Sequence, residues 1–305
     1  MTWRPSLVAL LVVGLTFVAA GCGGSADAGS DIVFVSTRDS DYALFGMNRD
    51  GSDQGRITEE KGDPRTPEGL LFQVEPAWSP DATQIAFSSR REGSLDIYVM
   101  DADGTNTRRL TSTKLDDQHP TWSPDGEHIV FDRSDGDLYV MKADGSAAKR
   151  LTTTLAPETE PAWSPDGRSI ACARRLPGTS IREVWLVDTE TGKAHQLTTL
   201  EAQSHTPAWA PDGRTIAFSS NDKGERFGIF TIRVDGTGLR QVTPASSSDA
   251  FEPSWSPDGS LIAFTRDGSI VTIDERGSEA VLTDAGNNDS SSAWRPVGGS
   301  EEDGS

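Results

Sequence analysis

Pro76-Ala77-Trp78-Ser79-Pro80-Asp81 is the stretch that decides the fold, because the chain repeats it. Close copies stand at residues 120–125, 161–166, 207–212 and 253–258, and a shortened copy, Ser-Ala-Trp-Arg-Pro, stands at 292–296. The tryptophans of these copies recur at intervals of 44, 41, 46, 46 and 39 residues. A period of about 40 to 50 residues is typical of the blades of β-propellers.

Each repeat contains further segments of strand length. After the tryptophan segment come an apolar triplet such as Ile85-Ala86-Phe87, a third segment such as Ile97-Tyr98-Val99-Met100, and a short fourth one such as Arg109-Leu110-Thr111. A Pro-Asp-Gly turn joins the first two segments in most copies, since proline presets φ and glycine accepts a positive one. None of the segments has the 3.6-residue apolar rhythm of a helix. The repeat therefore predicts four-stranded antiparallel blades without helices.

The number of blades follows from the two ends of the repeat region. Residues 31–58 supply strands two, three and four of a unit without a tryptophan strand, and Trp294 supplies a tryptophan strand with nothing after it. Joined together, they complete a sixth blade beside the five intact ones. We therefore expect an all-β, six-bladed propeller over residues 31–296, closed by the C-terminal strand joining the N-terminal blade. Such closure leaves only short, protected strand edges.

The N-terminal segment has the features of an export signal. An apolar run of 14 residues, Leu7 to Ala20, follows a single basic residue and is too short to span a bilayer comfortably. The small residues before Cys22 resemble the bacterial lipobox, in which the cysteine is lipidated and becomes the new N-terminus. We expect a lipoprotein signal peptide over 1–21 and a lipidated flexible tether over 22–30. The alternative is a plain secretory signal cut near Ala20.

The net charge and the number of cysteines limit the partners and the metal sites that the chain can have. The 305 residues include 47 acidic and 28 basic ones, a net charge of −19, which repels nucleic acid and anionic lipid headgroups. We expect no nucleic-acid partner, membrane contact through the lipid anchor alone, and a monomer. The two cysteines cannot build a multi-cysteine metal site. With Cys22 lipidated, Cys172 is expected to be a small buried core residue. The acidic stretch 297–305 is expected to be a disordered tail.

One set of polar residues is expected to meet at a mouth of the propeller channel. The first strand of each blade lines the channel, so the residues three before each tryptophan should converge: Glu75, His119, Glu160, Thr206, Glu252 and Ser291, with Gln118, His205 and Asp289 nearby. Three carboxylates and a histidine on one axis favour a bound cation or a basic group of a partner. We expect no resident cofactor, and a divalent cation at this mouth is the alternative.

Two longer connections break the period, at residues 59–72 and at 221–227. Loops on a rigid scaffold commonly carry recognition, and the first of these contains an apolar triplet. The residues expected to bind a partner are therefore Glu75, His119, Glu160, His205, Glu252, Leu70, Leu71 and Phe72.

The combination of Trp-Ser-Pro-Asp-Gly, Ile-Ala-Phe, and Asp-Gly before Arg-Leu-Thr resembles the WD-like repeat of the TolB propeller family over residues 31–296. The resemblance implies an envelope propeller that docks a protein at its channel mouth. Related propellers also occur in peptidases and in oligogalacturonate lyases, whose channel histidines hold a divalent metal. We expect the chain to depart from TolB itself, because the stretch between Cys22 and Asp31 is too short for the N-terminal α/β domain and the expected lipidation signal directly precedes the propeller.

These observations favour a non-catalytic binding scaffold over an enzyme. The Gly-x-Ser-x-Gly elbow of serine hydrolases does not occur in the sequence. We expect a lipid-anchored propeller on the extracytoplasmic side of a bacterial cell membrane or outer membrane, binding a protein or envelope-polysaccharide partner. The alternative is a metal-dependent polysaccharide lyase or hydrolase, which would need a general base and metal ligands within reach of one point at the mouth.

Overall fold

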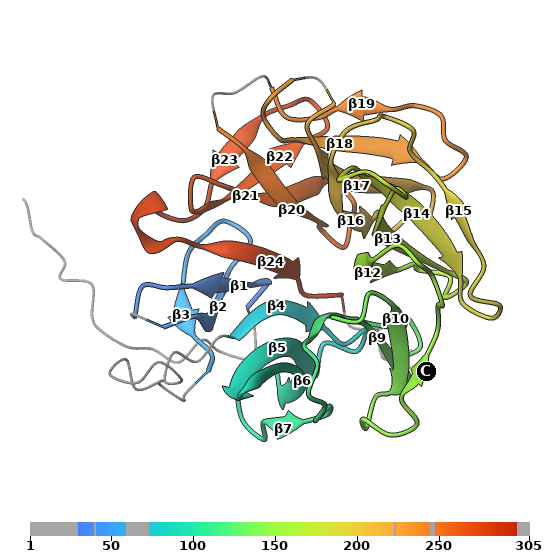
Figure 1. Cartoon of the computed structure of the whole chain (residues 1–305). Coiled ribbons are helices and arrows are strands. Elements are labelled where there is room, and N and C mark those ends of the chain that lie inside the picture. The colour runs from blue at the N-terminus through green and yellow to red at the C-terminus, as the bar shows by residue number, and fades with distance from the viewer. Residues whose placement is uncertain (1–29, 40, 59–72, 223, 245–247, 298–305) are drawn as a thin grey trace, which may run out of the picture.

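The computed structural model describes residues 30–39, 41–58, 73–222, 224–244 and 248–297. Over this part of the chain, six four-stranded antiparallel sheets form the blades of a ring (Figure 1), which confirms the predicted six-bladed propeller. The innermost strand of each blade contacts the innermost strands of its two neighbours, so the ring is closed.

The first three blades contain the following strands. Blade one consists of β24 (Ser290–Trp294), β1 (Ile32–Ser36), β2 (Ala43–Met47) and β3 (Gly55–Arg56). Blade two consists of β4 (Gln73–Trp78), β5 (Gln84–Glu92), β6 (Ser94–Asp101) and β7 (Arg108–Arg109). Blade three consists of β8 (Asp117–Trp122), β9 (His128–Arg133), β10 (Leu138–Lys142) and β11 (Lys149–Arg150).

The other three blades have the same order from the channel outward. Blade four consists of β12 (Glu158–Trp163), β13 (Ser169–Arg175), β14 (Arg182–Asp188) and β15 (Ala194–Gln196). Blade five consists of β16 (Ser204–Trp209), β17 (Thr215–Ser220), β18 (Gly228–Arg233) and β19 (Arg240–Gln241). Blade six consists of β20 (Ala250–Trp255), β21 (Leu261–Arg266), β22 (Ser269–Asp274) and β23 (Glu279–Val281), and the 3-10 turn η1 (Ala285–Asn287) leads to β24.

Blade one joins the two ends of the repeat region, as predicted. Strand β24 pairs antiparallel with β1, so that Trp294 lies opposite Ile32, and the backbone N–H of Arg295 donates to the carbonyl of Asp31 at 2.8 Å. The chain therefore closes the ring with its last described strand.

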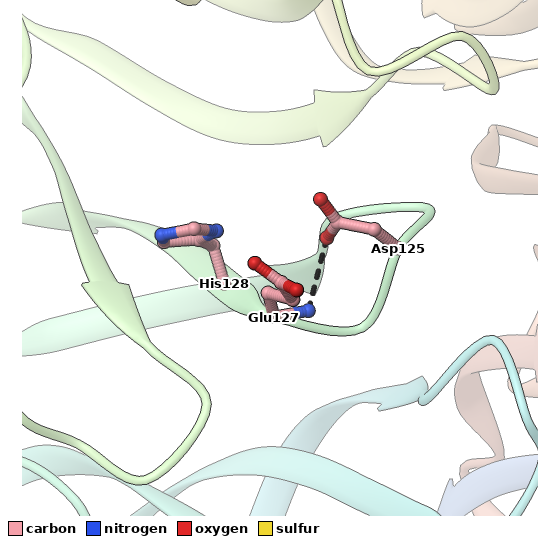
Figure 2. A group of neighbouring side chains, drawn as sticks. All are labelled: Asp125, Glu127 and His128. Carbon is pink, nitrogen blue, oxygen red and sulfur yellow. Dashed lines mark hydrogen bonds between the residues drawn. The ribbon is translucent and has the colours of Figure 1, made fainter.

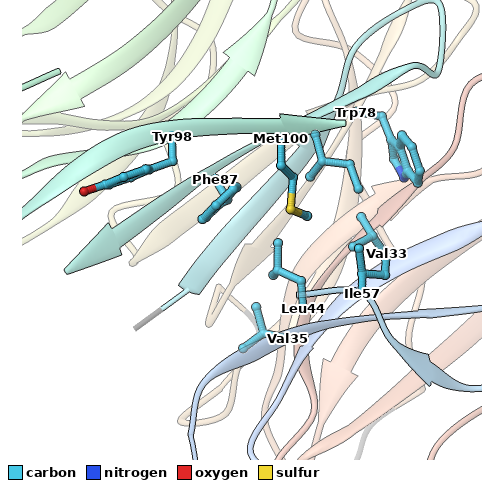
Figure 3. Close-up of a cluster of buried hydrophobic side chains, with 9 residues drawn as sticks. Val33, Val35, Leu44, Ile57, Trp78, Phe87, Tyr98 and Met100 are labelled. Atoms are coloured by element: carbon cyan, nitrogen blue, oxygen red, sulfur yellow. The ribbon is translucent and has the colours of Figure 1, made fainter. Parts of the chain in front are cut away.

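Apolar side chains fill the space between neighbouring blades. Figure 3 shows this core between blades one and two, where Trp78 packs against the aliphatic side chains of blade one. Each large apolar side chain buried in this way stabilises the fold by roughly 1.5–3 kcal/mol. Cys172 is fully buried in the equivalent core between blades three and four, which confirms its predicted role. The cluster of Figure 3 consists of Val33, Val35, Leu44, Ile57, Trp78, Ile85, Phe87, Tyr98 and Met100.

The Ser-Pro-Asp turn explains why the repeat keeps these residues. The Ser79 hydroxyl donates to Asp81 Oδ1 at 2.6 Å and accepts the N–H of Gln84 at 2.9 Å, while the N–H of Thr83 donates to the same carboxylate oxygen at 3.1 Å. These contacts hold β4 and β5 together at the turn. The repeated aspartates are therefore turn-stabilising residues.

Candidate functional site

The channel mouth is built from the same irregularity in every innermost strand. In blade two the pairing of β4 with β5 shifts register between Val74 and Ala77, which leaves Glu75 and Pro76 opposite a single residue. Such a β-bulge re-aims the side chain that it carries. Proline suits this position because it has no N–H to leave unpaired. The corresponding shift occurs in all six blades.

At each bulge, one residue adopts the left-handed backbone conformation. Its φ lies between 48° and 58° in all six blades, although the conformation is uncommon for residues other than glycine. These are the residues three before each tryptophan, and together they line a hollow of about 230 Å³. The predicted convergence is thus confirmed. The lining residues are Glu75, Pro76, His119, Pro120, Glu160, Pro161, Thr206, Pro207, Glu252, Pro253, Ser291 and Ser292.

Each mouth glutamate binds the backbone of the next blade. The N–H of His119 donates to Glu75 Oε2 at 2.8 Å, the N–H of Thr206 donates to Glu160 Oε2 at 2.7 Å, and the N–H of Ser291 donates to Glu252 Oε2 at 2.8 Å. The left-handed conformation directs these N–H groups toward the neighbouring carboxylate. The three carboxylates are therefore oriented by backbone donors of the next blade.

In blades three and five the mouth residue is not a glutamate. There a residue of the second strand accepts the N–H of the mouth residue in the next blade. Asp132 Oδ1 accepts the N–H of Glu160 at 3.0 Å, and Ser219 Oγ accepts the N–H of Glu252 at 3.2 Å. The sequence reasoning missed Asp132. The signal was present, since Asp132 occupies the place in the second strand that Ser88 and Thr265 occupy in blades two and six.

His119 lies between two carboxylates. Its Nδ1 is 2.7 Å from Asp132 Oδ1, and its Nε2 is 3.1 Å from Glu75 Oε1 in the neighbouring blade. Burial alone would lower the pKa of His119, but the charges of Glu75 and Asp132 outweigh it and raise the pKa well above 6.5. The imidazole is thus a cation fixed within an acidic ring.

Glu160, in blade four, is the acidic counterpart of this histidine in blade three. Burial alone would raise the pKa of Glu160, whereas the hydrogen bond from His205 and the charge of His119 lower it below 4.5. His205 Nδ1 lies 3.5 Å from Glu160 Oε1, so His205 supports the mouth from its rim rather than lining the hollow. Glu160 is therefore ionised at neutral pH.

The rim beside His205 is aromatic. The ring of Phe227 lies 5.9 Å from His205 and 4.8 Å from Phe251, centroid to centroid. The sequence reasoning pointed to the loop that ends at Phe227 but not to this pair of rings. Asp289, expected near the mouth, instead pairs with Arg38 at 2.9 Å and is fully buried.

The mouth carries more negative than positive charge. Glu75, Glu160, Glu252 and Asp132 surround one imidazolium, His119. Glu75, Glu160 and Glu252 line the hollow directly, and the nearby phenylalanines add apolar surface. This arrangement can bind a cationic group with an aliphatic stem, such as the end of a lysine or arginine side chain.

Metal-ligating atoms come close together elsewhere in the described residues. Asp125, Glu127 and His128 lie in the turn that leads into β9, with their ligand atoms within 4.8 Å of one another (Figure 2). Asp125 Oδ1 already accepts the Glu127 N–H at 2.9 Å and the Ser123 hydroxyl at 2.5 Å. This group is therefore a repeat turn with two added ligand-type side chains. His128 is half-buried, whereas Asp125 and Glu127 are exposed.

Several sequence predictions fall outside the described residues. These are the signal peptide, Cys22, most of the tether, Leu70, Leu71, Phe72 and nearly all of the expected tail. In the part of the chain that the structure describes, no helix has both the length and the apolar character needed to cross a membrane.

Comparison with known proteins supports the propeller. The family model described as the TolB beta propeller domain matches residues 69–175 and 132–297. A protein named TolB homolog from Chlorobium luteolum is 30% identical over 145 residues, and the matched region is 34% of this chain and 31% of that protein. An uncharacterized peptidase, YuxL, from Bacillus subtilis is 41% identical over 63 residues, which are 20% of this chain and 10% of that protein. The chain thus spans a third or less of the length of these relatives.

Solved structures show the same fold. TolB from Acinetobacter baumannii superposes with a TM-score of 0.73 at 22% identity, covering 90% of this chain and 68% of that one. An oligogalacturonate lyase in complex with manganese superposes with a TM-score of 0.52 at 19% identity, covering 68% of this chain and 64% of that one. At these identities the likeness concerns the fold alone.

Proposed function

Because the chain belongs to the TolB β-propeller family, we propose that it is a non-catalytic binding scaffold of the bacterial cell envelope whose channel mouth docks a protein partner. The observation that carries this proposal is the fixed acidic ring of Glu75, Glu160 and Glu252 around a hollow of about 230 Å³. Each of these carboxylates is oriented by a backbone N–H of the next blade, so the site is formed before any partner arrives. Preorganisation of this kind lowers the cost of binding.

The chemistry of the mouth indicates which part of the partner it receives. The hollow is smaller than the roughly 300–1000 Å³ of pockets for drug-sized ligands, and it suits one or two side chains. Its carboxylates favour a lysine, an arginine or a free amino terminus, and Phe227 and Phe251 can pack against the aliphatic part of such a group. The partner is accordingly a protein that presents a basic segment, and an envelope polysaccharide is the alternative occupant.

The proposed location is supported by the N-terminal signal and by the family. Lipid on Cys22 would hold the propeller on the extracytoplasmic side of the cell membrane or the outer membrane, and two acyl chains would make that anchor durable. Metabolic labelling with a fatty-acid analogue tests this part, since Cys22→Ser should abolish the label.

The mouth itself is tested by charge removal with a matched control. Glutamine at 75, 160 and 252 keeps an acceptor oxygen for the backbone N–H groups but removes three charges. Glutamine at the exposed positions 190, 201 and 275 makes the same change in net charge elsewhere. After chemical crosslinking in intact cells, the partner adduct should be lost in the mouth variant and retained in the control. An adduct of equal yield in both variants would refute docking at the mouth.

A metal-dependent polysaccharide lyase or hydrolase is the alternative. Both nitrogens of His119 lie within 3.1 Å of carboxylate oxygens, so a metal would have to displace Asp132 or Glu75 to reach them. Elemental analysis of protein purified without chelators, followed by titration with manganese and calcium, separates the two functions. A stoichiometric metal, or a melting temperature that rises at micromolar ion, would favour the enzyme.

A further inference from the structure

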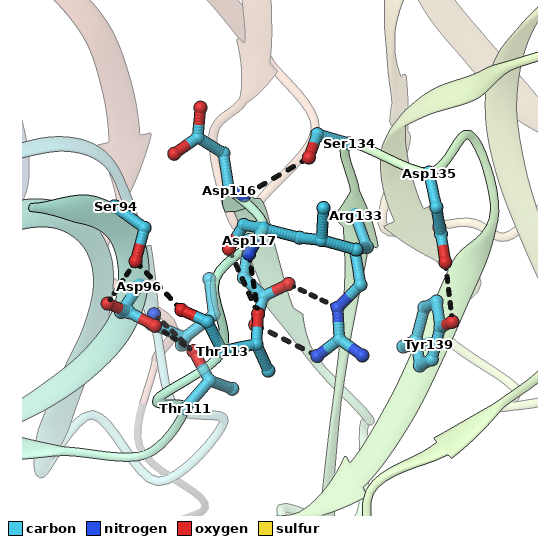
Figure 4. A network of polar contacts seen from close by, with 12 residues as sticks. Ser94, Asp96, Thr111, Thr113, Asp116, Asp117, Arg133, Ser134, Asp135 and Tyr139 are labelled. Atoms are coloured by element: carbon cyan, nitrogen blue, oxygen red, sulfur yellow. Dashed lines mark hydrogen bonds and ion pairs between the residues drawn. The ribbon is translucent and has the colours of Figure 1, made fainter.

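An arginine at the end of the second strand clamps a carboxylate in blade three. Arg133 lies opposite Asp117 in the register, and it donates from Nε to Oδ1 at 2.6 Å and from Nη2 to Oδ2 at 3.0 Å (Figure 4). The guanidinium also lies over the ring of Tyr139, 4.0 Å from its centroid. Blade four has the corresponding pair, with Arg174 3.6 Å from Glu158.

Blade six keeps the arginine and lacks the acid. Arg266 lies over Phe264, 4.9 Å from the ring centroid, but its register partner is Ala250. Nη1 of Arg266 donates to Glu279 at 2.6 Å. Its Nε and Nη2, the two atoms with which Arg133 holds Asp117, are buried without a hydrogen-bond partner. A buried donor without an acceptor is unfavourable, so this edge is suited to a ligand.

A second carboxylate of the repeat is missing next to this edge. In blade two, Asp96 at the start of the third strand pairs with Arg109 at 2.6 Å and accepts the Thr111 hydroxyl at 3.3 Å. In blade five the corresponding position is Gly228, and a Cβ there would lie 2.7 Å from Gln241 Nε2. Thr243, the counterpart of Thr111, accepts the Ile229 N–H at 3.0 Å and thus keeps a hydroxyl hydrogen to donate.

A cavity of about 250 Å³ lies between blades five and six and reaches Arg266. It is lined by Phe227, Phe230, Gln241, Thr243 and Pro244 of blade five and by Arg266 of blade six. Glu225 and Arg226 also line it and offset each other in charge. Apart from Glu225, the side chains around this cavity are hydrogen-bond donors and apolar groups.

We propose that this cavity binds a carboxylate supplied from outside the chain, held by the Nε–Nη2 edge of Arg266 as Asp117 is held by Arg133. The ligand is an aspartate or glutamate side chain of a polypeptide. The apolar wall of Phe227, Phe230 and Pro244 accommodates an aliphatic stem, whereas a sugar acid would place several hydroxyl groups against it. The site adjoins the rim of the acidic mouth through Phe227, and its charge preference is opposite to that of the mouth.

The test follows the Nε–H resonance of Arg266 in a ¹⁵N–¹H spectrum during titration, assigned by its absence in Arg266→Lys. The probes are sodium acetate, N-acetylglutamate α-amide and galacturonate, each compared with sodium chloride at equal ionic strength. Saturable shifts with acetate and the glutamate derivative are expected, with the glutamate derivative binding at least several-fold more tightly than galacturonate. A resonance that moves no more than in sodium chloride would overturn the proposal, and tighter binding of galacturonate would overturn its assignment to a polypeptide.

Two substitutions at one register position make the test specific. Ala250→Asp supplies an internal carboxylate, so it should raise the melting temperature by about 2 °C or more and abolish the acetate response. Ser204→Asp places the same acid opposite Ser220 instead of an arginine. It should therefore lower the melting temperature and leave the acetate response in place. An Ala250→Asp protein that still responds to acetate would contradict the site. Glutamine at position 160 should not change the response, which separates this site from the mouth.

Discussion

Nε2 of His119 lies 3.1 Å from Oε1 of Glu75, although the two residues belong to different blades. This contact joins the innermost strands of blades two and three at the channel mouth. It couples the charge of the mouth to the packing of the ring, so the same residues that would bind a partner also stabilise the propeller.

Replacement of His119 by glutamine should destabilise the protein in a pH-dependent manner. The pKa of His119 is raised in the folded state by Glu75 and Asp132, so its contribution is fully present below the unfolded value near 6.5 and is lost as the pH rises through the folded pKa. Hydrogen bonds to charged groups contribute about 1.5–3 kcal/mol. Denaturant unfolding should show a deficit of that order at pH 6 and a smaller one at pH 9. The exposed His195→Gln should show neither, and an equal deficit at both pH values would argue against a charged His119.

Glu158 should change the stability in the same direction with pH, but over a more acidic range. Burial raises its pKa above 4.5, so the folded state holds a proton that the unfolded state releases. The stability of the wild-type protein should therefore fall, relative to Glu158→Gln, as the pH rises from 4.5 through the raised folded pKa. Unfolding free energies at pH 4 and pH 7 test this, with Glu190→Gln as the exposed control. A difference that stays constant between the two pH values would contradict the shift.

Loss of the closing strand should open the ring. A chain that ends before Ser291 lacks most of β24, including Trp294, which is 8% exposed and packs between blades six and one. We expect the melting temperature to fall by 10 °C or more, since roughly 3–5 kcal/mol is lost for a buried tryptophan alone. A chain that ends at Val297 should melt like the full-length protein. Equal melting temperatures for the two truncated chains would disprove closure through β24.

Alanine substitutions at two glycines with the same backbone conformation distinguish the cost of backbone strain from the cost of a clash between blades. Gly104 and Gly236 have φ of 86° and 82°, and alanine at either position costs about 1 kcal/mol for the left-handed conformation. A Cβ at Gly104 would also lie 2.1 Å from the carbonyl oxygen of Ile57 in blade one, whereas nothing lies within 4 Å at Gly236. Gly104→Ala should therefore lower the free energy of unfolding at least twice as much as Gly236→Ala. Equal losses of unfolding free energy in the two variants would contradict a close contact between blades one and two at Gly104.

The sequence predicted the ring and the mouth because both depend on the repeat period. Once the tryptophans fix the innermost strands, the position three residues earlier falls at the same height in every blade. The repeat could not show that these residues adopt φ near 50–60°, since none of them is glycine. Because of this conformation, backbone N–H groups of the next blade donate to the carboxylates, which the sequence did not indicate.

Contacts between strands and between blades were the features that sequence reasoning missed. Asp132 reaches His119 because the bulge brings the second strand close to the mouth, and Phe227 meets Phe251 across two blades. The unpartnered edge of Arg266 depends on alanine at a register position that holds an acid in blades three and four. A comparison of aligned strand pairs, rather than of single repeats, could have found it.

Site-specific photocrosslinking from the mouth tests the central claim most directly. A benzophenone amino acid at position 206 lies in the hollow, and the same residue at the exposed position 147 lies in the turn after β10, at the end of blade three away from His119. In cells that produce the protein, we predict one defined protein adduct from position 206, none from position 147, and loss of the first adduct when Glu75, Glu160 and Glu252 are glutamine. An adduct from position 206 that persists without the three carboxylates, or no adduct from that position, would contradict a protein-docking mouth.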